Sequence, residues 1–207
     1  DEGQAMTKAA EFLVNAPVKP AGEIGGNLPC YQFTGDNRRI TVSKQGGFVV
    51  EYTDSRPIQE ATLRIDQALV KAEEILEDKG FENFVMRYYN LNNGILTINY
   101  AYSEKGITYY PDLLKIGIAM DNGQLVSLDA KGYIMNHTDR QLPQAQIVMA
   151  EARGKLSPHL EPKDEGTLAV IPSEGLREIA CYEFSCIGRD DEQVLVYVNI
   201  ETGEEEQ

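Results

Sequence analysis

The side chains of this chain that could do catalytic or metal chemistry are two histidines, three cysteines and many carboxylates. His137 and His159 are 22 residues apart, and neither has a cysteine or a second histidine at the short spacing typical of zinc ligands. Ser157 lies two residues before His159, but no nucleophile elbow surrounds it, and closeness in sequence does not supply the geometry of a catalytic triad. The sequence therefore predicts no metal site, no cofactor site and no catalytic histidine.

The 33 acidic residues raise the question of a glycosidase, which needs two carboxyl groups about 5 to 9.5 Å apart. Two acidic runs stand out, Asp190-Asp191-Glu192 at an expected turn and Glu204-Glu205-Glu206 in an expected terminal strand. Such runs most often form a solvated face or protect a strand edge from unwanted pairing. We predict that the chain is not an enzyme and assign no catalytic residue; the residues that bind a partner stay unassigned.

The cysteines are Cys30, Cys181 and Cys186, an odd number without a Cys-x-x-Cys motif. An extended strand would place the Cα atoms of Cys181 and Cys186 about 16 Å apart, well beyond the roughly 7 Å limit for a disulfide. Cys30 begins the run Cys-Tyr-Gln-Phe-Thr-Gly and Cys181 begins Cys-Tyr-Glu-Phe-Ser-Cys, which places both at matching positions. These positions predict small, inert core thiols. The sequence leaves their redox state open.

Tyrosine is abundant, with 11 residues, while tryptophan is absent. On a strand, Tyr100 and Tyr102 share one face, whereas the adjacent Tyr88 and Tyr89 point to opposite faces, so some rings are buried and others exposed. Packing within the sheet, a protein interface and sugar stacking all remain open. The tyrosines concentrated in the middle of the chain are Tyr88, Tyr89, Tyr100, Tyr102, Tyr109, Tyr110 and Tyr133.

A net charge of −14 excludes most nucleic-acid-binding proteins, because these gain much of their affinity from clustered lysine and arginine. The same charge permits contact with a basic partner protein. No segment approaches the roughly 18 consecutive apolar residues of a membrane span. The chain begins Asp1-Glu2-Gly3-Gln4, without a basic and apolar leader, so we expect a fragment or a mature form.

A strand-turn-strand pattern occurs three times and sets the expected architecture. Its turn glycines are Gly47, Gly123 and Gly203, separated by 76 and 80 residues, which is the spacing of small domains. We therefore expect three modules, at residues 1–57, 58–142 and 143–207. The three copies are Ile40 to Tyr52, Ile116 to Leu128 and Val196 to Gln207.

The second and third modules predict the same order of a helix followed by antiparallel strands. The first module is shorter, with a helix around Met6 to Leu13, and the stretch containing Pro17, Pro20 and Gly22 to Gly26 replaces its first strand with irregular chain. Asn-Gly in Asp121-Asn122-Gly123 indicates a type I′ hairpin turn. In module two we expect a helix at Asp66 to Glu77, strands at Phe84 to Leu91 and Ile95 to Tyr102, a turn at Asn92-Asn93-Gly94 and a break at Glu104-Lys105-Gly106. In module three we expect a helix at Gln144 to Leu156, strands at Thr167 to Ile171, Arg177 to Ile187 and Glu192 to Ile200, and a turn at Ser173-Glu174-Gly175.

The modules resemble the PepSY domain, an α+β unit in which a helix packs on a small antiparallel sheet. The resemblance rests on the alanine-rich helices, on Gln-Ala-Leu-Val-Lys-Ala in the middle helix, on the run Tyr110 to Ile118 and on the ending Tyr-Val-Asn-Ile-Glu-Thr-Gly-Glu-Glu. Three such units in tandem resemble the C-terminal region of the YpeB family of spore germination proteins. The fold class expected is α+β, with three tandem PepSY-like modules.

The family resemblance implies a non-enzymatic protein that stabilises, localises or regulates a SleB-like cortex-lytic enzyme. It also implies a place on the extracytoplasmic side of the spore inner membrane, in the cortex region, and a membrane-associated segment preceding this fragment. Two alternatives stay open. One is a PepSY-type peptidase inhibitor or propeptide-like regulator, whose partner would be a protease, and the other is a peptidoglycan-binding module.

Overall fold

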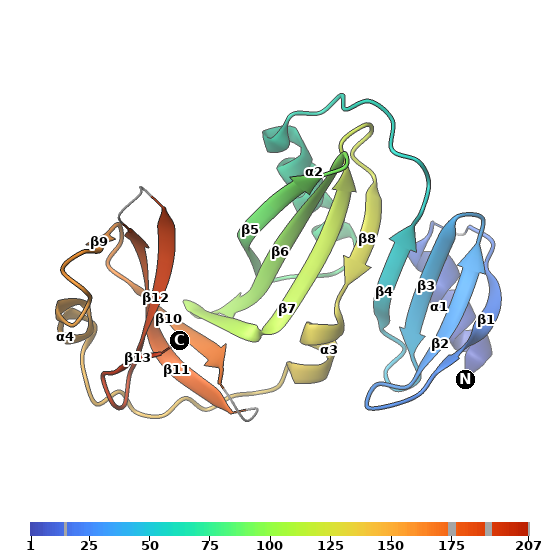
Figure 1. The fold of residues 1–207 in the computed structure, drawn as a ribbon. Helices are drawn as coiled ribbons and strands as arrows, with labels where there is room; N and C mark the ends of the chain where they lie inside the picture. The colour runs from blue at the N-terminus through green and yellow to red at the C-terminus, as the bar shows by residue number, and fades with distance from the viewer. Residues whose placement is uncertain (15, 174–176, 189–191, 207) are drawn as a thin grey trace. The chain divides into compact units, whose positions relative to one another are not determined.

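The computed structural model describes residues 1–14, 16–173, 177–188 and 192–206. The chain forms two compact units, one of residues Asp1–Ala101 and Asp112–His137 and the other of Tyr102–Pro111 and Thr138–Gln207. Both units combine helices with β-sheet, which confirms the α+β class (Figure 1). None of the helices in the described ranges is long and apolar enough to cross a membrane.

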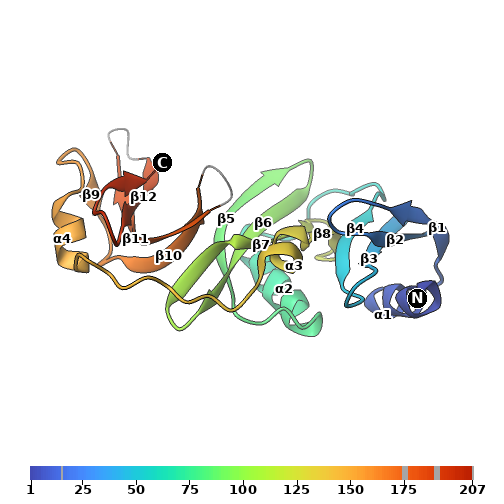
Figure 2. The same ribbon diagram turned by 90° about the horizontal axis from the view of Figure 1, so that it is seen from below.

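Unit 1 contains two helix-on-sheet halves whose strands join edge to edge. Its sheet has the order β1-β2-β3-β4-β8-β7, with β6 pairing β7 and β5 pairing β6. Helices α1 and α2 pack on one face of this sheet (Figure 2). The bounds are α1 (Glu2–Phe12), β1 (Lys19–Ile24), β2 (Cys30–Gly35), β3 (Arg38–Ser43), β4 (Val49–Asp54), α2 (Ile65–Asp78), β5 (Phe84–Asn92), β6 (Ile95–Glu104), β7 (Ile107–Ala119), β8 (Leu125–Asp129) and α3 (Lys131–Asn136).

Small residues bring the helices of unit 1 close to the sheet. Ala5 and Ala9 are the buried positions of α1, and Ala68, Ala72 and Leu76 are those of α2, all at the four-residue spacing that puts them on one helix face. They pack with inward-facing strand residues into one core. The largest fully buried side chains of that core are Phe33, Ile40, Leu96, Ile98, Tyr100, Leu114, Ile116 and Ile118.

Unit 2 has the strand order β10-β11-β12-β13, with β9 pairing β11. Residues 107–109 of β7 pair in parallel with 168–170 of β10, so the tip of the β6–β7 hairpin belongs to this unit. Its own core surrounds Phe184, Cys186 and Val198. The bounds are α4 (Met149–Gly154), β9 (Glu161–Pro162), β10 (Thr167–Pro172), β11 (Glu178–Ile187), β12 (Gln193–Asn199) and β13 (Glu205–Glu206).

A buried polar contact fixes the β7 tip in unit 2. The Tyr110 hydroxyl donates to Oε2 of the buried Glu183 at 2.5 Å, and the Tyr110 ring meets that of Tyr197 edge to face. Burial, followed by the hydrogen bond to Glu183, raises the pKa of Tyr110 far above its usual range. Tyr110 therefore stays a neutral donor, which compensates the Glu183 carboxylate inside the unit.

The threefold hairpin is confirmed in detail. Gly47, Gly123 and Gly203 all have positive φ, at 68°, 74° and 71°, which is the left-handed region that glycine adopts without steric cost. Each hairpin is closed by the same backbone hydrogen bond, from an N–H to the carbonyl five residues later. These bonds are Ser43 to Phe48 at 2.8 Å, Ala119 to Gln124 at 2.9 Å and Asn199 to Glu204 at 2.8 Å.

The type I′ prediction at Asn122-Gly123 is wrong, because only Gly123 of this pair has positive φ. Asn93 and Gly94 have φ of 50° and 74°, so the pair of positive values that a type I′ turn requires occurs between β5 and β6 instead. The connection from β7 to β8 is longer than two residues, and one glycine is enough to close it. Both loops contain Asn-Gly, so this pair alone did not indicate which loop forms the type I′ turn.

The predicted third helix, Gln144 to Leu156, is too long, because α4 begins only at Met149. The backbone N–H groups of Gln146 and Ile147 instead donate to the carbonyl of Ile200, at 2.8 and 3.3 Å. The chain before α2 makes the equivalent contact, since Thr62 and Leu63 donate to the Met120 carbonyl. In both places the segment that precedes a helix is held against the hairpin, and in the third module this contact keeps residues 146 and 147 out of the helix.

The expectation of irregular chain around Pro20 is also corrected. Lys19–Ile24 forms strand β1, which pairs antiparallel with β2 and has a register shift between Pro20 and Gly22. All six residues are exposed. Proline is tolerated on an edge strand because its missing N–H faces solvent, and glycine there commonly marks a bulge. The first helix also begins earlier than predicted, at Glu2, where Asp1 and Gln4 form a capping box.

An ion pair fastens the end of β4 to the β7–β8 hairpin. The Arg56 guanidinium donates two hydrogen bonds to the Asp121 carboxylate, both of 2.8 Å, and the Gln59 N–H donates to the same carboxylate at 2.8 Å. The Arg56 hydrogen bonds lower the pKa of Asp121 well below its usual range. Bidentate geometry and a nearly enclosed Asp121 side chain distinguish this contact from an ordinary surface pair.

Replacing Asp121 with asparagine keeps the side-chain shape and removes the charge that Arg56 binds. We expect the urea midpoint of unfolding to fall at pH 7, while Asp139→Asn, at an exposed loop position, leaves it unchanged. Because the pKa of folded Asp121 is depressed, the advantage of the native residue is complete above the unfolded pKa of about 3.9 and is lost progressively as the pH falls below it. Equal midpoints for Asp121→Asn and the native chain at pH 7 would show that the Arg56–Asp121 ion pair does not stabilise unit 1.

Candidate functional site

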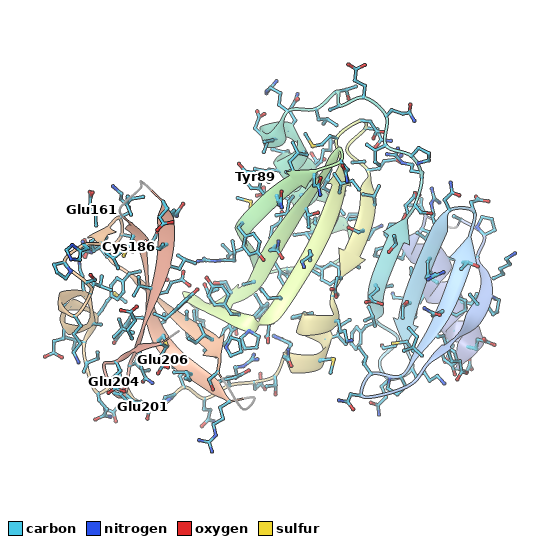
Figure 3. The ribbon with its side chains drawn as sticks, in the orientation of Figure 1. Tyr89, Glu161, Cys186, Glu201, Glu204 and Glu206 are labelled. Atoms are coloured by element: carbon cyan, nitrogen blue, oxygen red, sulfur yellow. The ribbon has the colours of Figure 1, made fainter. Side chains whose placement is uncertain are left out.

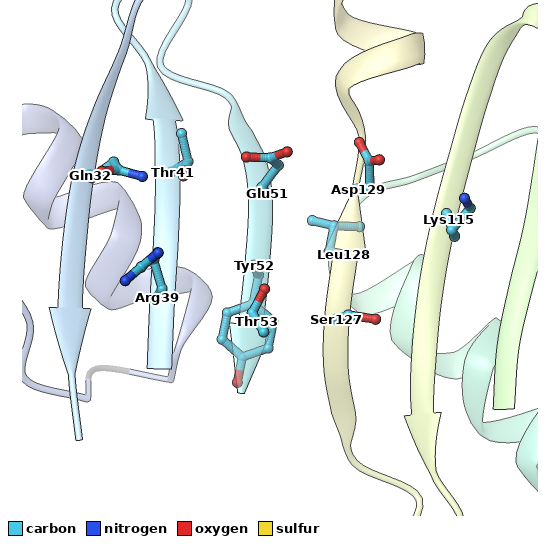
Figure 4. Close-up of a pocket in the computed structure, with 10 residues that line it drawn as sticks. All are labelled: Gln32, Arg39, Thr41, Glu51, Tyr52, Thr53, Lys115, Ser127, Leu128 and Asp129. Carbon is cyan, nitrogen blue, oxygen red and sulfur yellow. The ribbon is translucent and has the colours of Figure 1, made fainter. Parts of the chain in front are cut away.

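An open polar cleft of about 360 Å³ lies across β2, β3, β4, β8 and β7 of unit 1 (Figure 4). The inward neighbours of its residues, such as Ile40, Tyr52 and Leu128, belong to the helix-side core. Alternation along the strands therefore projects the polar residues from the opposite face of the sheet. The polar lining comprises Gln32, Arg39, Thr41, Glu51, Thr53, Lys115, Ser127 and Asp129.

Strand register aligns these side chains in two rows across the join between the two halves of unit 1. One row runs Gln32, Thr41, Glu51, Asp129, Lys115, each residue directly opposite the next on the neighbouring strand. The second row places Arg39 opposite Thr53, Thr53 opposite Ser127, and Ser127 opposite Gly117. Residues far apart in sequence thus form one surface.

Two carboxylates face each other at the centre of this cleft. Glu51 on β4 is the direct partner of Asp129 on β8, and Figure 4 shows them at the same level on the two strands. Within the described ranges, neither carboxylate forms an ion pair, although Asp129 accepts a hydrogen bond from the Lys131 N–H at 3.1 Å. Like charges directly opposite each other on a sheet destabilise it. The centre of the cleft is therefore available for an external cation or hydrogen-bond donor.

A second cleft of about 310 Å³ continues the first toward the loop at residues 24–28 and α3. The two share Thr41 and Glu51, and the second adds Lys131 and Met135 of α3. Together they offer carboxylates, ammonium and guanidinium groups, hydroxyls and an amide on one open face. Such a surface suits a polar segment of another protein better than a small apolar ligand.

The two histidines belong to different units, His137 to unit 1 and His159 to unit 2. His137 Nδ1 is 2.7 Å from Oδ2 of Asp112, whose carboxylate is fully buried, and the His137 ring packs on Tyr133. This pair ties the end of α3 to β7. His159 is exposed in unit 2, where its N–H donates to Ser157 Oγ, an arrangement of a loop turn and not of a triad. No group of three metal-ligating side chains occurs in the part of the chain that the structure describes.

The three thiols are buried and unbridged, as expected for core cysteines. Burial raises the pKa of Cys30, of Cys186 and, to about 12, of Cys181. Since the thiolate is the reactive form, all three side chains are poor nucleophiles in the folded protein. The prediction of inert core positions agrees with these surroundings.

The tyrosines divide between the core and the surface. Tyr100 is buried beneath α2, and burial raises its pKa to about 12. Tyr88 and Tyr89 on β5 are 62% and 45% exposed. Tyr89 is marked on β5 in Figure 3. The expected mixture of buried and exposed rings is therefore present, and the exposed pair stays available for binding.

The two acidic runs lie only partly within the described residues. Asp190 and Asp191 lie outside the described residues, as do Glu174 and Gly175 of the turn predicted before β11. Glu205 and Glu206 form the short strand β13, and Glu206 accepts a hydrogen bond from the Asn199 amide at 2.7 Å. Glu204 and Glu206 are labelled in Figure 3.

Sequence reasoning missed the residues that line the polar cleft. Glu51 and Asp129 belong to different expected modules, and their proximity depends on β4 pairing with β8. The available signal was the polar alternation at the end of the first two copies of the hairpin repeat, namely Glu51 and Thr53 around Tyr52, and Ser127 and Asp129 around Leu128. That pattern identifies a solvent face but not the neighbouring strand.

The sequence matches the family described as YpeB sporulation, PepSY1 and PepSY2 domains, over residues 2–143. Curated relatives named sporulation protein YpeB include one from Halalkalibacterium halodurans, 32% identical over 97% of this chain, and one from Oceanobacillus iheyensis, 28% identical over 99%. The chain spans just under half of these relatives, 44% and 47% of their lengths. A third, from Bacillus subtilis, is 26% identical over 81% of this chain and 37% of its own length.

The fold matches the solved Bacillus megaterium YpeB C-terminal domain with a TM-score of 0.89. The match covers 100% of this chain and 96% of that chain, at 24% sequence identity. The likeness shows a shared mixed α+β fold over the whole length.

Replacing Glu51 with glutamine removes one of the two facing carboxylates and keeps the side-chain size. We expect the free energy of unfolding to rise by about 0.2–1 kcal/mol at low salt, with a smaller gain at high salt. The matched control is Glu60→Gln, at an exposed loop position. Urea unfolding at two ionic strengths measures both; a destabilised Glu51→Gln variant would mean that the native carboxylate is satisfied within the chain.

The buried thiols are expected to resist a thiol-specific colorimetric reagent in native buffer and to react fully in denaturant. Their burial and raised pKa both slow attack, so reaction in the native state requires opening of the surrounding sheet. Rapid reaction of even one thiol in native buffer would contradict the core placement of Cys30, Cys181 or Cys186.

Proposed function

The chain belongs to the YpeB family of sporulation proteins, and we propose that it acts in spore germination by binding another protein without catalysing a reaction. Its partner in this proposal is a SleB-like cortex-lytic enzyme, which the chain stabilises, localises or regulates by direct contact. The place of action is the extracytoplasmic side of the spore inner membrane, in the cortex region.

The observation that carries this proposal is the open, charged face built jointly by β4 and β8. The opposed carboxylates Glu51 and Asp129 remain without an ion pair among the described side chains, while Arg39 and Lys115 offer positive charge nearby. Mixed charges on a wide surface give electrostatic complementarity to a protein partner. Stabilisation then follows from mass action, because a protein that binds only the folded enzyme lowers its unfolded fraction.

We also propose that the chain consists of three tandem PepSY-like modules, at 1–57, 58–142 and 143–207. The family description supports this for the first two, since it names PepSY1 and PepSY2 over residues 2–143. For the third, support comes from the hairpin hydrogen bond and the docking of pre-helix N–H groups, which recur at Met120 and Ile200.

A second candidate function, peptidoglycan binding, is favoured by the exposed rings of Tyr88 and Tyr89, because sugars stack on aromatic faces. Co-sedimentation with purified peptidoglycan tests it, with Tyr88→Ser/Tyr89→Ser as the variant that should lose binding. Equal recovery of the native chain and this variant in the pellet would contradict sugar stacking on these two rings. The inhibitor alternative predicts instead a dose-dependent loss of protease activity.

Mixing the purified chain with a purified SleB-like enzyme is expected to give binding at roughly tens of micromolar or tighter, measured by titration calorimetry. At a chain concentration about 100 times Kd, cleavage of the enzyme through global unfolding should slow about 100-fold. An unrelated protein of similar negative charge serves as the control. No heat of binding together with unchanged proteolysis would contradict direct stabilisation.

A further inference from the structure

Strand β5 is an edge strand that exposes large apolar side chains. It pairs only with β6 in the described sheet, so its outer backbone groups face away from any neighbouring strand. All but two of its nine residues are exposed. A long edge with this composition is a template for strand addition. The exposed apolar and aromatic residues are Val85, Met86, Tyr88, Tyr89 and Leu91.

The two faces of β5 differ in what lies beside them. Phe84 packs on Phe81 and the helix-side core, so alternation assigns Met86 and Tyr88 to the face that α2 covers. Val85, Arg87, Tyr89 and Leu91 then belong to the opposite face, where Arg87 is half-buried and the other three are exposed. An added strand would place alternate side chains against the α2 side and against this second row, which is apolar except for Arg87.

The α2 side is strongly acidic. A cleft of about 400 Å³ between α2 and the start of β5 is lined by Glu73, Glu77 and Glu82, together with Phe84 and Tyr100. No lysine or arginine among the described residues lines it. Glu73 and Glu77 are four residues apart on one helix face, a like-charge spacing that destabilises a helix.

These carboxylates differ from their neighbours in lacking a partner in the described chain. Glu74 pairs with Lys71 and Asp78 pairs with Lys79, whereas no ion pair involves Glu73, Glu77 or Glu82 among the described residues. The charge beside the exposed edge is therefore uncompensated, and a cationic segment laid along β5 would neutralise it.

We propose that the outer edge of β5 binds an extended segment of a partner protein, with lysine or arginine on the face toward α2 and apolar residues on the other face. Backbone hydrogen bonds to the edge would supply affinity, and the alternating side chains would supply specificity. A second copy of this chain is the poorer occupant, because it carries the same net charge of −14 and has only Arg87 as a cation in β5.

This inference names the surface used in the proposed partner contact and so rests on the proposed function. A synthetic probe separates the two: a labelled peptide that alternates lysine and valine, matched in length to β5, with binding followed by fluorescence anisotropy. The same peptide with alternate backbone nitrogens methylated cannot donate edge hydrogen bonds, and a glutamate–valine peptide reverses the charge.

The test variant on the protein is Glu73→Gln/Glu77→Gln/Glu82→Gln. Its matched control is Glu60→Gln/Glu165→Gln/Glu204→Gln, which changes the net charge equally at exposed positions elsewhere. Val85→Ser/Leu91→Ser tests the apolar row, with Val148→Ser/Leu195→Ser as the exposed control. All these side chains are exposed, and circular dichroism with urea unfolding verifies that each variant keeps the native fold.

We expect the lysine–valine peptide to bind the native chain. The variant Glu73→Gln/Glu77→Gln/Glu82→Gln is expected to weaken this binding at least about tenfold, or ~1.4 kcal/mol, whereas its control weakens it less than about twofold. The methylated and glutamate–valine peptides should not bind. Absence of binding, equal weakening by the control triple, or full binding of the methylated peptide would overturn the edge site. A dimer seen in sedimentation and dissolved by Val85→Ser/Leu91→Ser would assign the edge to a second copy instead. Enzyme binding that persists after any of these failures would leave the proposed function intact.

Discussion

The antiparallel pairing of β4 with β8 makes one sheet of the two halves of unit 1, and the polar cleft depends on that pairing. The pairing covers only a few residues, centred on Tyr52 opposite Leu128. The Arg56–Asp121 ion pair secures the chain just beyond it, where an isolated strand contact would be weak. The inward side chains of the pair complete the helix-side core, and the outward ones form the polar cleft.

The same hairpin recurs in each of the three proposed modules. A glycine with positive φ closes the turn, and in two places the carbonyl three residues before it accepts the N–H groups of the segment that leads into a helix. Helix position is thus set by backbone hydrogen bonds that any sequence of suitable shape can make.

Local rules predicted the hairpin glycines, the amphipathic α2 and the core cysteines, because each depends on neighbours in sequence. They failed where distant pairing decides the outcome. Residues around Pro20 form an edge strand only because β2 lies beside them, and Gln146 stays out of a helix because Ile200 accepts its N–H. Glu51 meets Asp129 through a register that alternation alone does not determine. The sequence indicated that β5 is a strand, but it did not indicate that this strand lies at an edge of the sheet.

We propose that this protein works through contact of its unit 1 surfaces with another protein. Hydrogen–deuterium exchange of the chain, recorded alone and with a SleB-like enzyme, is the decisive test, because exchange reports each backbone amide that gains protection. We expect slower exchange in β5 and in the strands that form the polar cleft, with unit 2 strands unchanged. Identical exchange throughout the chain in the presence of saturating enzyme would contradict it.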